Sequence, residues 1–479
     1  MTRFGAQSFA SSAPCPIPQP DVTASMTTAS HRSPKGARIY NLFPTLLGPV
    51  PDWHQRLPAI ADMGFDWIFL NPVQLPGDSG SLYSIKDPGR LNPALRPQRQ
   101  AASGRTKPAR DDDVLLGEFC AAAHEHGIRV MLDLVINHSA KDSVLVDAHP
   151  EWFARDEQGR VRSPFVRDLD DPDKVTVWED LAELDYSERP ARGAMLRFWE
   201  DLIGRYLELG FAGFRCDAAY KLPADVWRRL ITGARKKDAD ACFFAESLGA
   251  PEEAVEQLRG AGFDYLFNSA KWWDFRAGWL LDQYRRFRDL APSVAFPESH
   301  DTERLAAESG GSERESRFKY LFAAAFSAGV MMPIGYEFGF RRSLHVVETT
   351  PEDWERGRAE SPFDISDYIA RVNAMKAATP VLCEEGPQER VTDPNEPLVG
   401  LLRRSTQGSQ RCLTLINPDP DHPQGRGVQQ LADALGCAPA DIREITPATA
   451  TDADAPLESL AERNDLQVPP RSLRLFVRD

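Results

Sequence analysis

Short apolar segments alternate with longer amphipathic ones from about residue 38 onward, and this alternation limits the possible folds more than any other feature of the sequence. The apolar segments are rich in β-branched and aromatic residues and are too short for helices, so we expect each to be a strand. These strand candidates are residues 37–41, 65–70, 128–135, 211–215, 241–245, 263–267, 293–296 and 329–333.

The segments between these strands carry apolar residues at helical spacing. Residues 112–126 and 193–209 each stop directly before a glycine, as helices with a glycine C-cap do, and 314–327 is a third helix candidate. Strands and helices in this alternation predict an α/β protein with a (β/α)₈ TIM barrel. A doubly wound open sheet is the alternative.

Two regions depart from the alternation. Residues 138–190, after the third strand, are polar, rich in Asp, Pro and Arg, and much longer than an ordinary βα loop, so we expect a loop subdomain over the catalytic face. Beyond about residue 380, strand-like segments lie between turn-rich ones, which predicts a C-terminal β-sandwich domain. The predicted organisation is a flexible N-terminal tail at 1–37, the barrel at 38–380 and the β-domain at 381–479.

Composition narrows the classes of partner. The chain has 479 residues, 42% of them hydrophobic, and a net charge of −15, which disfavours nucleic acid and anionic membranes and suits a neutral sugar. The first 37 residues contain no apolar run typical of a signal peptide or a membrane span. The seven cysteines have no paired spacing, so we expect buried free thiols, as at Cys216 and Cys242, and a cytoplasmic location.

Polar residues stand where four of the predicted strands end. They are Asp133, Asn137 and His138 at the third strand, Arg215 and Asp217 at the fourth, Glu246 at the fifth, and His300 and Asp301 after the seventh. In a barrel these strand ends meet at one face, so we expect the side chains to line a single pocket.

A pair of carboxylates is sufficient to cleave a glycosidic bond, if one is ionised and the other holds a proton. Arg215 and Asp217 are two residues apart in a strand and point the same way, so the arginine would keep Asp217 ionised. Glu246 follows Phe-Phe-Ala, and partial burial there would raise its pKa towards that of a general acid.

The ordered set of these motifs resembles the α-amylase family, glycoside hydrolase family 13. Its four signature regions are similar to Asp133-xxx-Asn137-His138, Gly213-Phe-Arg215-x-Asp217-Ala, Glu246 and His300-Asp301. Tyr83-xxx-Asp87 and Gly335-Tyr-Glu337-Phe-Gly339 are similar to two further motifs of the family, and the resemblance spans roughly residues 38–380.

The resemblance implies a role for each matching residue. Asp217 would be the nucleophile of a retaining double displacement, Glu246 the general acid/base, and Asp301 the residue that stabilises the distorted sugar. The pocket for the sugar would be built by Tyr83, Asp87, His138, Arg215 and His300, with Tyr83 stacking on a sugar ring. No organic cofactor and no catalytic metal are implied.

Departures from the family pattern bear on the substrate. Tyr220 and Lys221 stand where members often have Lys-His, and because that His commonly helps to hold calcium through its backbone, calcium binding is an open question here. Lys221-Leu-Pro223 and Asp301-Thr-Glu-Arg304 resemble the maltosyltransferase branch that uses maltose 1-phosphate. In that branch, Lys221 and Arg304 would contact a phosphate.

We therefore expect a retaining hydrolase or transglycosylase that acts on α-1,4-glucans or maltooligosaccharides. A maltosyltransferase with maltose 1-phosphate as donor is the alternative within the same chemistry. Two alternatives from other classes are a non-catalytic glucan-binding or interaction protein, and an unrelated barrel hydrolase with a metal held by Asp133, His138, His300 and Asp301. The sequence leaves the acceptor, the linkage specificity and the oligomeric state open.

Overall fold

The computed structural model describes residues 35–97, 110–167, 175–448 and 464–478. Eight parallel strands form a closed barrel, in chain order around the ring. They are β1 (Arg38–Leu42), β2 (Trp67–Leu70), β5 (Arg129–Leu134), β10 (Gly213–Cys216), β11 (Cys242–Glu246), β12 (Tyr265–Phe267), β13 (Ser293–Ala295) and β14 (Gly329–Pro333). Each corresponds to a predicted strand, so the barrel is confirmed and the doubly wound sheet is wrong.

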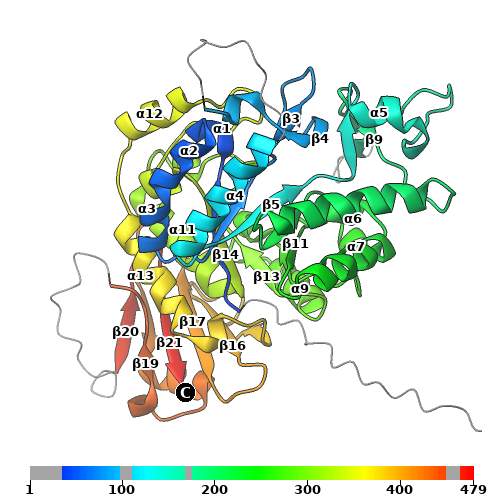
Figure 1. Ribbon diagram of the computed structural model, residues 1–479. Helices are drawn as coiled ribbons and strands as arrows, with labels where there is room; N and C mark the ends of the chain where they lie inside the picture. The colour runs from blue at the N-terminus through cyan, green and yellow to red at the C-terminus, as the bar shows by residue number, and fades with distance from the viewer. Residues whose placement is uncertain (1–34, 98–109, 168–174, 449–463, 479) are drawn as a thin grey trace, which may run out of the picture. The chain divides into compact units, whose positions relative to one another are not determined.

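Helices cover the outside of the barrel (Figure 1). The three predicted helices are α4 (Arg110–Glu125), α6 (Arg192–Glu208) and α11 (Glu313–Phe326). Gly127 and Gly210, after the first two, have φ values of 73° and 97°, the left-handed conformation that glycine adopts most easily. The remaining barrel helices are α1 (Pro44–Leu47), α2 (Val50–Trp53), α3 (Leu57–Asp62), α7 (Ala224–Lys237), α8 (Glu252–Glu256), α9 (Trp279–Phe287), α10 (Leu305–Glu308), α12 (Pro351–Ala359) and α13 (Ser366–Ala377).

Side-chain alternation along the strands separates an inner core from an outer one. In β11, Phe244 packs inside the barrel with residues from other strands, such as Trp67 and Met131, whereas Phe243 packs against the helices. Because successive side chains of a strand point to opposite faces, Glu246 shares the inner face with Phe244. The same alternation turns Arg215 inward.

The segment at 138–190 contains small antiparallel pairs and a short helix. β6 (His138–Ala140) pairs with β9 (Leu181–Glu183), β7 (Phe165–Arg167) pairs with β8 (Val175–Val177), and α5 (Val144–Ala148) lies between β6 and β7 in sequence. A second hairpin, β3 (Gln74–Pro76) with β4 (Ile85–Leu91), follows β2. Both excursions leave the barrel after the carboxyl end of a strand.

The C-terminal region is an antiparallel sheet with a smaller second layer. The five-stranded sheet has the order β15 (Gln388–Arg390), β16 (Val399–Arg404), β17 (Arg411–Asn417), β21 (Ser472–Arg478) and β19 (Arg443–Glu444). Apolar side chains of α14 (Val428–Leu435) and of the ribbon β18 (Gln424–Gly427) with β20 (Asp465–Val468) pack with those of the sheet. The second layer is therefore a helix and a ribbon, where we expected the second sheet of a sandwich.

The predicted division into a tail, a barrel and a β-domain stays a prediction. Residues 1–34 of the tail lie outside the described part of the chain. The barrel and the C-terminal sheet belong to one compact unit. Arg403 of β16 contacts the end of α11, where its Nη1 donates hydrogen bonds of 3.2 Å to the carbonyls of Ala325 and Phe326.

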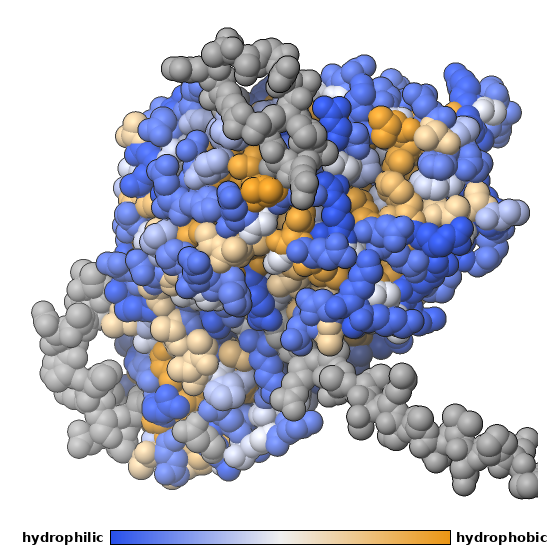
Figure 2. All heavy atoms as spheres, in the orientation of Figure 1, coloured by the Kyte–Doolittle hydropathy of each residue, from blue (hydrophilic) through white to orange (hydrophobic). Residues whose placement is uncertain are grey.

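The cysteine prediction is confirmed where the structure describes it: Cys216 and Cys242 are buried free thiols. Polar residues cover most of the described surface on the face drawn in Figure 2. Within the described ranges, no helix combines the length and apolar character that crossing a bilayer requires.

Candidate active site

Arg215 lies at the centre of a cluster of four carboxylates at the carboxyl ends of the strands. Its Nη1 donates to both oxygens of Asp133, at 2.9 and 2.8 Å, and to Oδ1 of Asp217 at 2.8 Å. Its Nη2 lies 2.7 Å from Oε1 of Glu246 and 3.9 Å from Oδ2 of Asp301. Parallel register places Arg215 directly beside Asp133 of β5, and the inner face of β11 supplies Glu246. The structure thus brings together the three acids expected to be catalytic.

Asp217 and Glu246 are held on the same guanidinium through different nitrogens. Glu246 also accepts a 2.7 Å hydrogen bond on Oε2 from the backbone N–H of Ala218, and Asp217 accepts one of 3.2 Å on Oδ2 from the amide of Asn137. Retaining glycosidases hold their two carboxyl groups about 5–5.5 Å apart, and contact with one guanidinium is compatible with such a separation.

Burial and neighbouring charge raise the pKa of Glu246 to about 8. Desolvation is the largest cause, followed by the opposing effect of Arg215 and then by repulsion from Asp217 and Asp301. Burial likewise raises the pKa of Asp133 to about 7, against the pull of Arg215. A carboxyl with the pKa of Glu246 holds its proton at neutral pH, as a general acid must.

Tyr83, His300 and Asp301 form a chain of contacts at one side of the cluster. The Tyr83 hydroxyl donates to Oδ2 of Asp133 at 2.7 Å and lies 2.7 Å from Nε2 of His300, whose Nε2 is also 3.1 Å from Oδ2 of Asp301. The Tyr83 hydroxyl uses its single proton in the hydrogen bond to Asp133. Nε2 of His300 is therefore the protonated ring nitrogen, which faces the Tyr83 oxygen and the Asp301 carboxylate. The Tyr83 and His300 rings lie parallel with centroids 5.6 Å apart. Stacking of Tyr83 on a sugar stays a prediction.

A cavity of about 300 Å³ adjoins the cluster. Its lining residues are Asn137, His138, Arg162, Pro164, Phe165, Glu183, Leu184, Tyr186, Lys221 and Leu222. Burial lowers the pKa of Lys221, while the charge of Asp217 opposes that shift. The Lys221 ammonium lies 4.9 Å from the ring centre of Trp178, and His138 contacts the Tyr83 carbonyl through Nε2 at 3.0 Å. Lys221 and His138 thus line a cavity together with Asn137, whose amide donates to Asp217.

Two predicted binding residues lie away from the acids. Arg304 is 1% exposed and forms a 2.7 Å ion pair with Glu298, so its guanidinium is committed inside the protein and the expected phosphate contact needs correction. Asp87 lies on β4, where its Oδ1 accepts a 2.9 Å hydrogen bond from the N–H of Gly89, and its role in sugar binding stays a prediction.

Sequence reasoning missed residues that act through short contacts. Asn71, at the end of β2, donates to the Tyr83 hydroxyl at 3.0 Å, and the N–H of Ala218 holds Glu246. Asn71 could have been found because it is a polar residue directly after an apolar strand, the pattern that located the other site residues. A backbone N–H leaves no such signal, because every residue type except proline supplies one.

Whether calcium binds stays a prediction, because Ca²⁺ also takes backbone and amide oxygens as ligands. The described residues contain no group of three or more His, Cys, Asp or Glu side chains placed to hold a metal ion. Within the described part of the chain, the buried Oδ1 of Asn137 has no hydrogen-bond partner, and the cavity beside it is lined by Lys221 and by the ion pair of Arg162 with Glu183. Asp133 and Asp301 both contact Arg215, so the metal-dependent barrel hydrolase has no support.

Solved structures with this architecture include α-amylases. The chain matches an α-amylase from Geobacillus thermoleovorans with a TM-score of 0.70 and 15% identity, over 94% of this chain and 100% of that one. It matches an α-amylase from Lactobacillus plantarum with a TM-score of 0.68 and 21% identity, over 92% and 99%. At these identities the likeness shows the fold alone.

Sequence comparison adds the family. Residues 34–158 match the model of the glycogen debranching enzyme glucanotransferase domain. A Burkholderia pseudomallei protein named α-1,4-glucan:maltose-1-phosphate maltosyltransferase is 30% identical over 387 residues, 79% of this chain. The chain belongs to the α-amylase family. A second maltosyltransferase of that name, from Myxococcus xanthus, is 24% identical over 81% of this α-amylase-family chain. The matches cover 32% and 59% of these two relatives, so the chain spans only part of their length.

Proposed function

We propose that this chain transfers a maltosyl group from maltose 1-phosphate to a hydroxyl of an α-1,4-glucan, with net retention at the anomeric carbon. The observation that carries the proposal is the pair Asp217 and Glu246 on one guanidinium, with Lys221 in the adjoining cavity. The maltosyltransferase names of the Burkholderia and Myxococcus relatives support this donor over the hydrolysis that the motifs alone suggested.

The first half-reaction forms a covalent glycosyl-enzyme. Oδ2 or Oδ1 of Asp217 attacks the anomeric carbon, the bond from that carbon to the phosphate oxygen breaks, and Glu246 gives its proton to the departing oxygen. Asp301, whose side chain is 43% exposed, offers a carboxylate to the sugar hydroxyls. Positive charge that develops on the sugar ring is stabilised by the surrounding carboxylates.

The second half-reaction returns the enzyme to its starting state. Once Asp217 is esterified, its negative charge no longer raises the pKa of Glu246, so Glu246 becomes the base that takes the proton of the acceptor hydroxyl. The acceptor oxygen then bonds to the anomeric carbon and the ester to Asp217 breaks. Two inversions give net retention.

The cavity beside His138 suits both the leaving phosphate and the acceptor, which would occupy it in turn. Lys221 supplies a positive charge there for the phosphate. Trp178, beside Lys221, is 38% exposed and offers an aromatic face for a glucan ring. Phe165, a half-exposed ring of β7, lines the same cavity.

Hydrolysis is the second candidate, because water in place of the glucan completes the same chemistry. A Haloarcula japonica protein named α-amylase MalA is 24% identical over 60% of this chain. A non-catalytic glucan-binding role is less well supported, because the carboxylates that it would not need are all present and share one guanidinium.

The test is phosphate release from maltose 1-phosphate with and without maltohexaose, together with the length and anomeric form of the products. We expect release that depends on the glucan and products extended by two glucose units in α-linkage. Equal release without glucan would identify a hydrolase of the donor, and shortening of maltohexaose without donor would identify an amylase. The Asp217→Asn variant is the control for contaminating activity.

A further inference from the structure

We propose that Glu298 and Arg304 form a buried clasp that positions Asp301 for the reaction. Both act through the backbone of the loop that carries Asp301, so they are positioning residues. The proposal rests on the proposed function for the role of Asp301.

The clasp closes the loop between β13 and α10. Glu298 and Arg304 are each 1% exposed, and Oε1 of Glu298 lies 2.7 Å from Nη1 of Arg304. The second oxygen of Glu298 accepts the N–H of Leu305, the first residue of α10, at 2.5 Å. The ion pair thus joins the two ends of a segment that contains His300 and Asp301.

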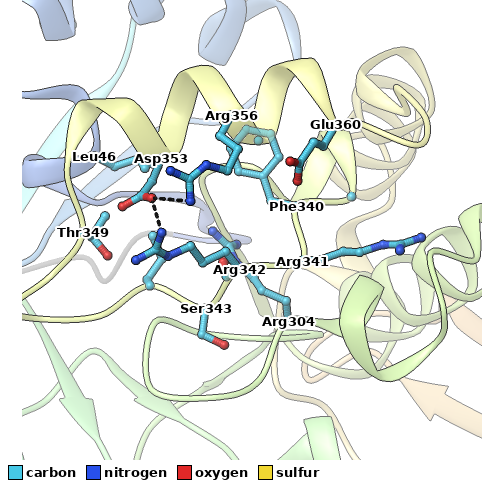
Figure 3. A pocket seen from close by; sticks show the side chains of 13 residues that line it. Leu46, Arg304, Phe340, Arg341, Arg342, Ser343, Thr349, Asp353, Arg356 and Glu360 are labelled. Carbon is cyan, nitrogen blue, oxygen red and sulfur yellow. Dashed lines mark hydrogen bonds and ion pairs between the residues drawn. The ribbon is translucent and has the colours of Figure 1, made fainter.

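Arg304 also fixes this loop to the end of β14. Its Nη2 donates to the Ile334 carbonyl at 2.9 Å and its Nε to the Arg342 carbonyl at 3.2 Å. Figure 3 shows Arg304 beside Arg342 and Ser343 on the wall of a small pocket, and the Ser343 hydroxyl donates to Glu303 at 3.1 Å. Each of the three guanidinium nitrogens of Arg304 is thereby bonded to a different segment.

Asp301 needs support of this kind because its own side chain has few contacts. It is 43% exposed, with Oδ2 3.1 Å from His300 and 3.9 Å from Arg215. Inside the loop, the hydroxyl of Ser299 accepts the N–H of Asp301 at 3.2 Å. The direction of the carboxylate is therefore set mainly by the backbone, which the clasp holds at both ends.

A buried ion pair contributes little stability beyond what apolar residues of similar size would give, but removing one partner leaves a costly lone charge. Glu298→Leu/Arg304→Met removes both charges, but it also leaves the Leu305 N–H and the Ile334 and Arg342 carbonyls without these partners, so its thermal midpoint should fall. Activity is therefore compared well below that midpoint, where the folded variant should lose tenfold or more in kcat with a smaller change in KM. In an Asp301→Asn background the same double change should cause less than a twofold further loss, because the group being positioned is gone.

A second readout does not depend on turnover. Because Asp301 raises the pKa of Glu246, displacement of Asp301 in the clasp variant should lower that pKa, as measured by NMR titration of ¹³C-labelled glutamate. Glu385→Leu/Arg403→Met removes another buried ion pair, at the C-terminal sheet, and should leave the Glu246 pKa unchanged. If the double clasp variant does not fold, Arg304→Lys keeps the charge but cannot make all three bonds, and should show the same shift.

The proposal is overturned if a folded clasp variant keeps the wild-type kcat and Glu246 pKa, or if its loss in kcat adds in full to that of Asp301→Asn. Failure of the proposed function is a different result: wild-type protein would release no phosphate from maltose 1-phosphate, while the Glu246 pKa in the clasp variant would still report on the position of Asp301.

Discussion

The backbone N–H of Ala218 donates a 2.7 Å hydrogen bond to Oε2 of Glu246. Ala218 directly follows Asp217, so this bond ties the position of the proposed acid/base to that of the proposed nucleophile. The Ala218 backbone has φ 39° and ψ 48°, a left-handed conformation that costs a non-glycine residue about 1–3 kcal/mol. This unfavourable backbone conformation therefore lies at the residue that connects the two acids.

The pH dependence of activity should report the proton on Glu246. Since its pKa is raised to about 8 and the protonated form is the general acid, kcat/KM should fall as pH rises through about 8. Asp301→Asn removes a charge that raises this pKa, so the alkaline limb of its residual activity should move to lower pH. An alkaline limb at the same pH in both proteins would contradict the assignment.

Glu246 should also make the folded state less stable at high pH. Its pKa is about 8 when folded and about 4.3 in an unfolded chain, so the folded state binds the proton more tightly. The proton on Glu246 therefore makes its full contribution to the free energy of unfolding below about pH 4, and this contribution is lost as the pH rises to about 8. At pH 9, Glu246→Gln should unfold at a higher temperature than the wild type. Its free energy of unfolding should be larger by a few kcal/mol, because each pKa unit corresponds to about 1.4 kcal/mol.

The control for that measurement is the same pair of proteins at pH 4, where both carry a neutral side chain at position 246 and their thermal midpoints should converge. A difference that does not change with pH would mean that packing, and not the proton on Glu246, separates them.

Trp178→Ala should weaken use of the glucan acceptor. Loss of ring stacking is worth about 0.5–1.5 kcal/mol, or roughly two- to twelvefold in KM for maltohexaose. The rate of formation of the glycosyl-enzyme from maltose 1-phosphate, followed by rapid quench, should be unchanged. Val144→Ala changes a similarly exposed apolar side chain of the loop segment and should alter neither quantity.

Lys221→Met should weaken binding of the phosphate-bearing donor. A lost charge-assisted contact predicts at least a tenfold rise in KM for maltose 1-phosphate. Transfer from α-maltosyl fluoride, whose leaving group carries no phosphate, should change much less. Equal losses with the two donors would show that Lys221 acts on the sugar or on the fold.

The sequence predicted the barrel strands and the main site residues, because each has a recognisable pattern of residue types. Short apolar segments between amphipathic ones predicted every barrel strand, and the polar residues at the ends of β10 and β11 predicted that Arg215 and Glu246 share one site. The phosphate contact of Arg304 that the resemblance to the maltosyltransferase branch implied is wrong, because Arg304 is buried in an ion pair with Glu298. No pattern in the sequence indicated that ion pair. The two residues are six apart, a spacing that matches neither helical nor strand periodicity.

The C-terminal region shows a similar limit. The apolar segments 398–402, 412–416 and 472–476 predict β16, β17 and β21. The sequence did not predict that α14 packs against the sheet, because a short amphipathic segment between turns is weak evidence for a helix.

The central claim is that Asp217 is the nucleophile of a double displacement. Glu246→Gln treated with α-maltosyl fluoride tests it most directly, because fluoride leaves without a proton while the missing base slows the second step. Mass spectrometry of peptides should find one maltosyl group on Asp217, and Asp217→Asn/Glu246→Gln should carry none. A maltosyl group on another residue, or maltose released in the β-form with no covalent species, would contradict the account.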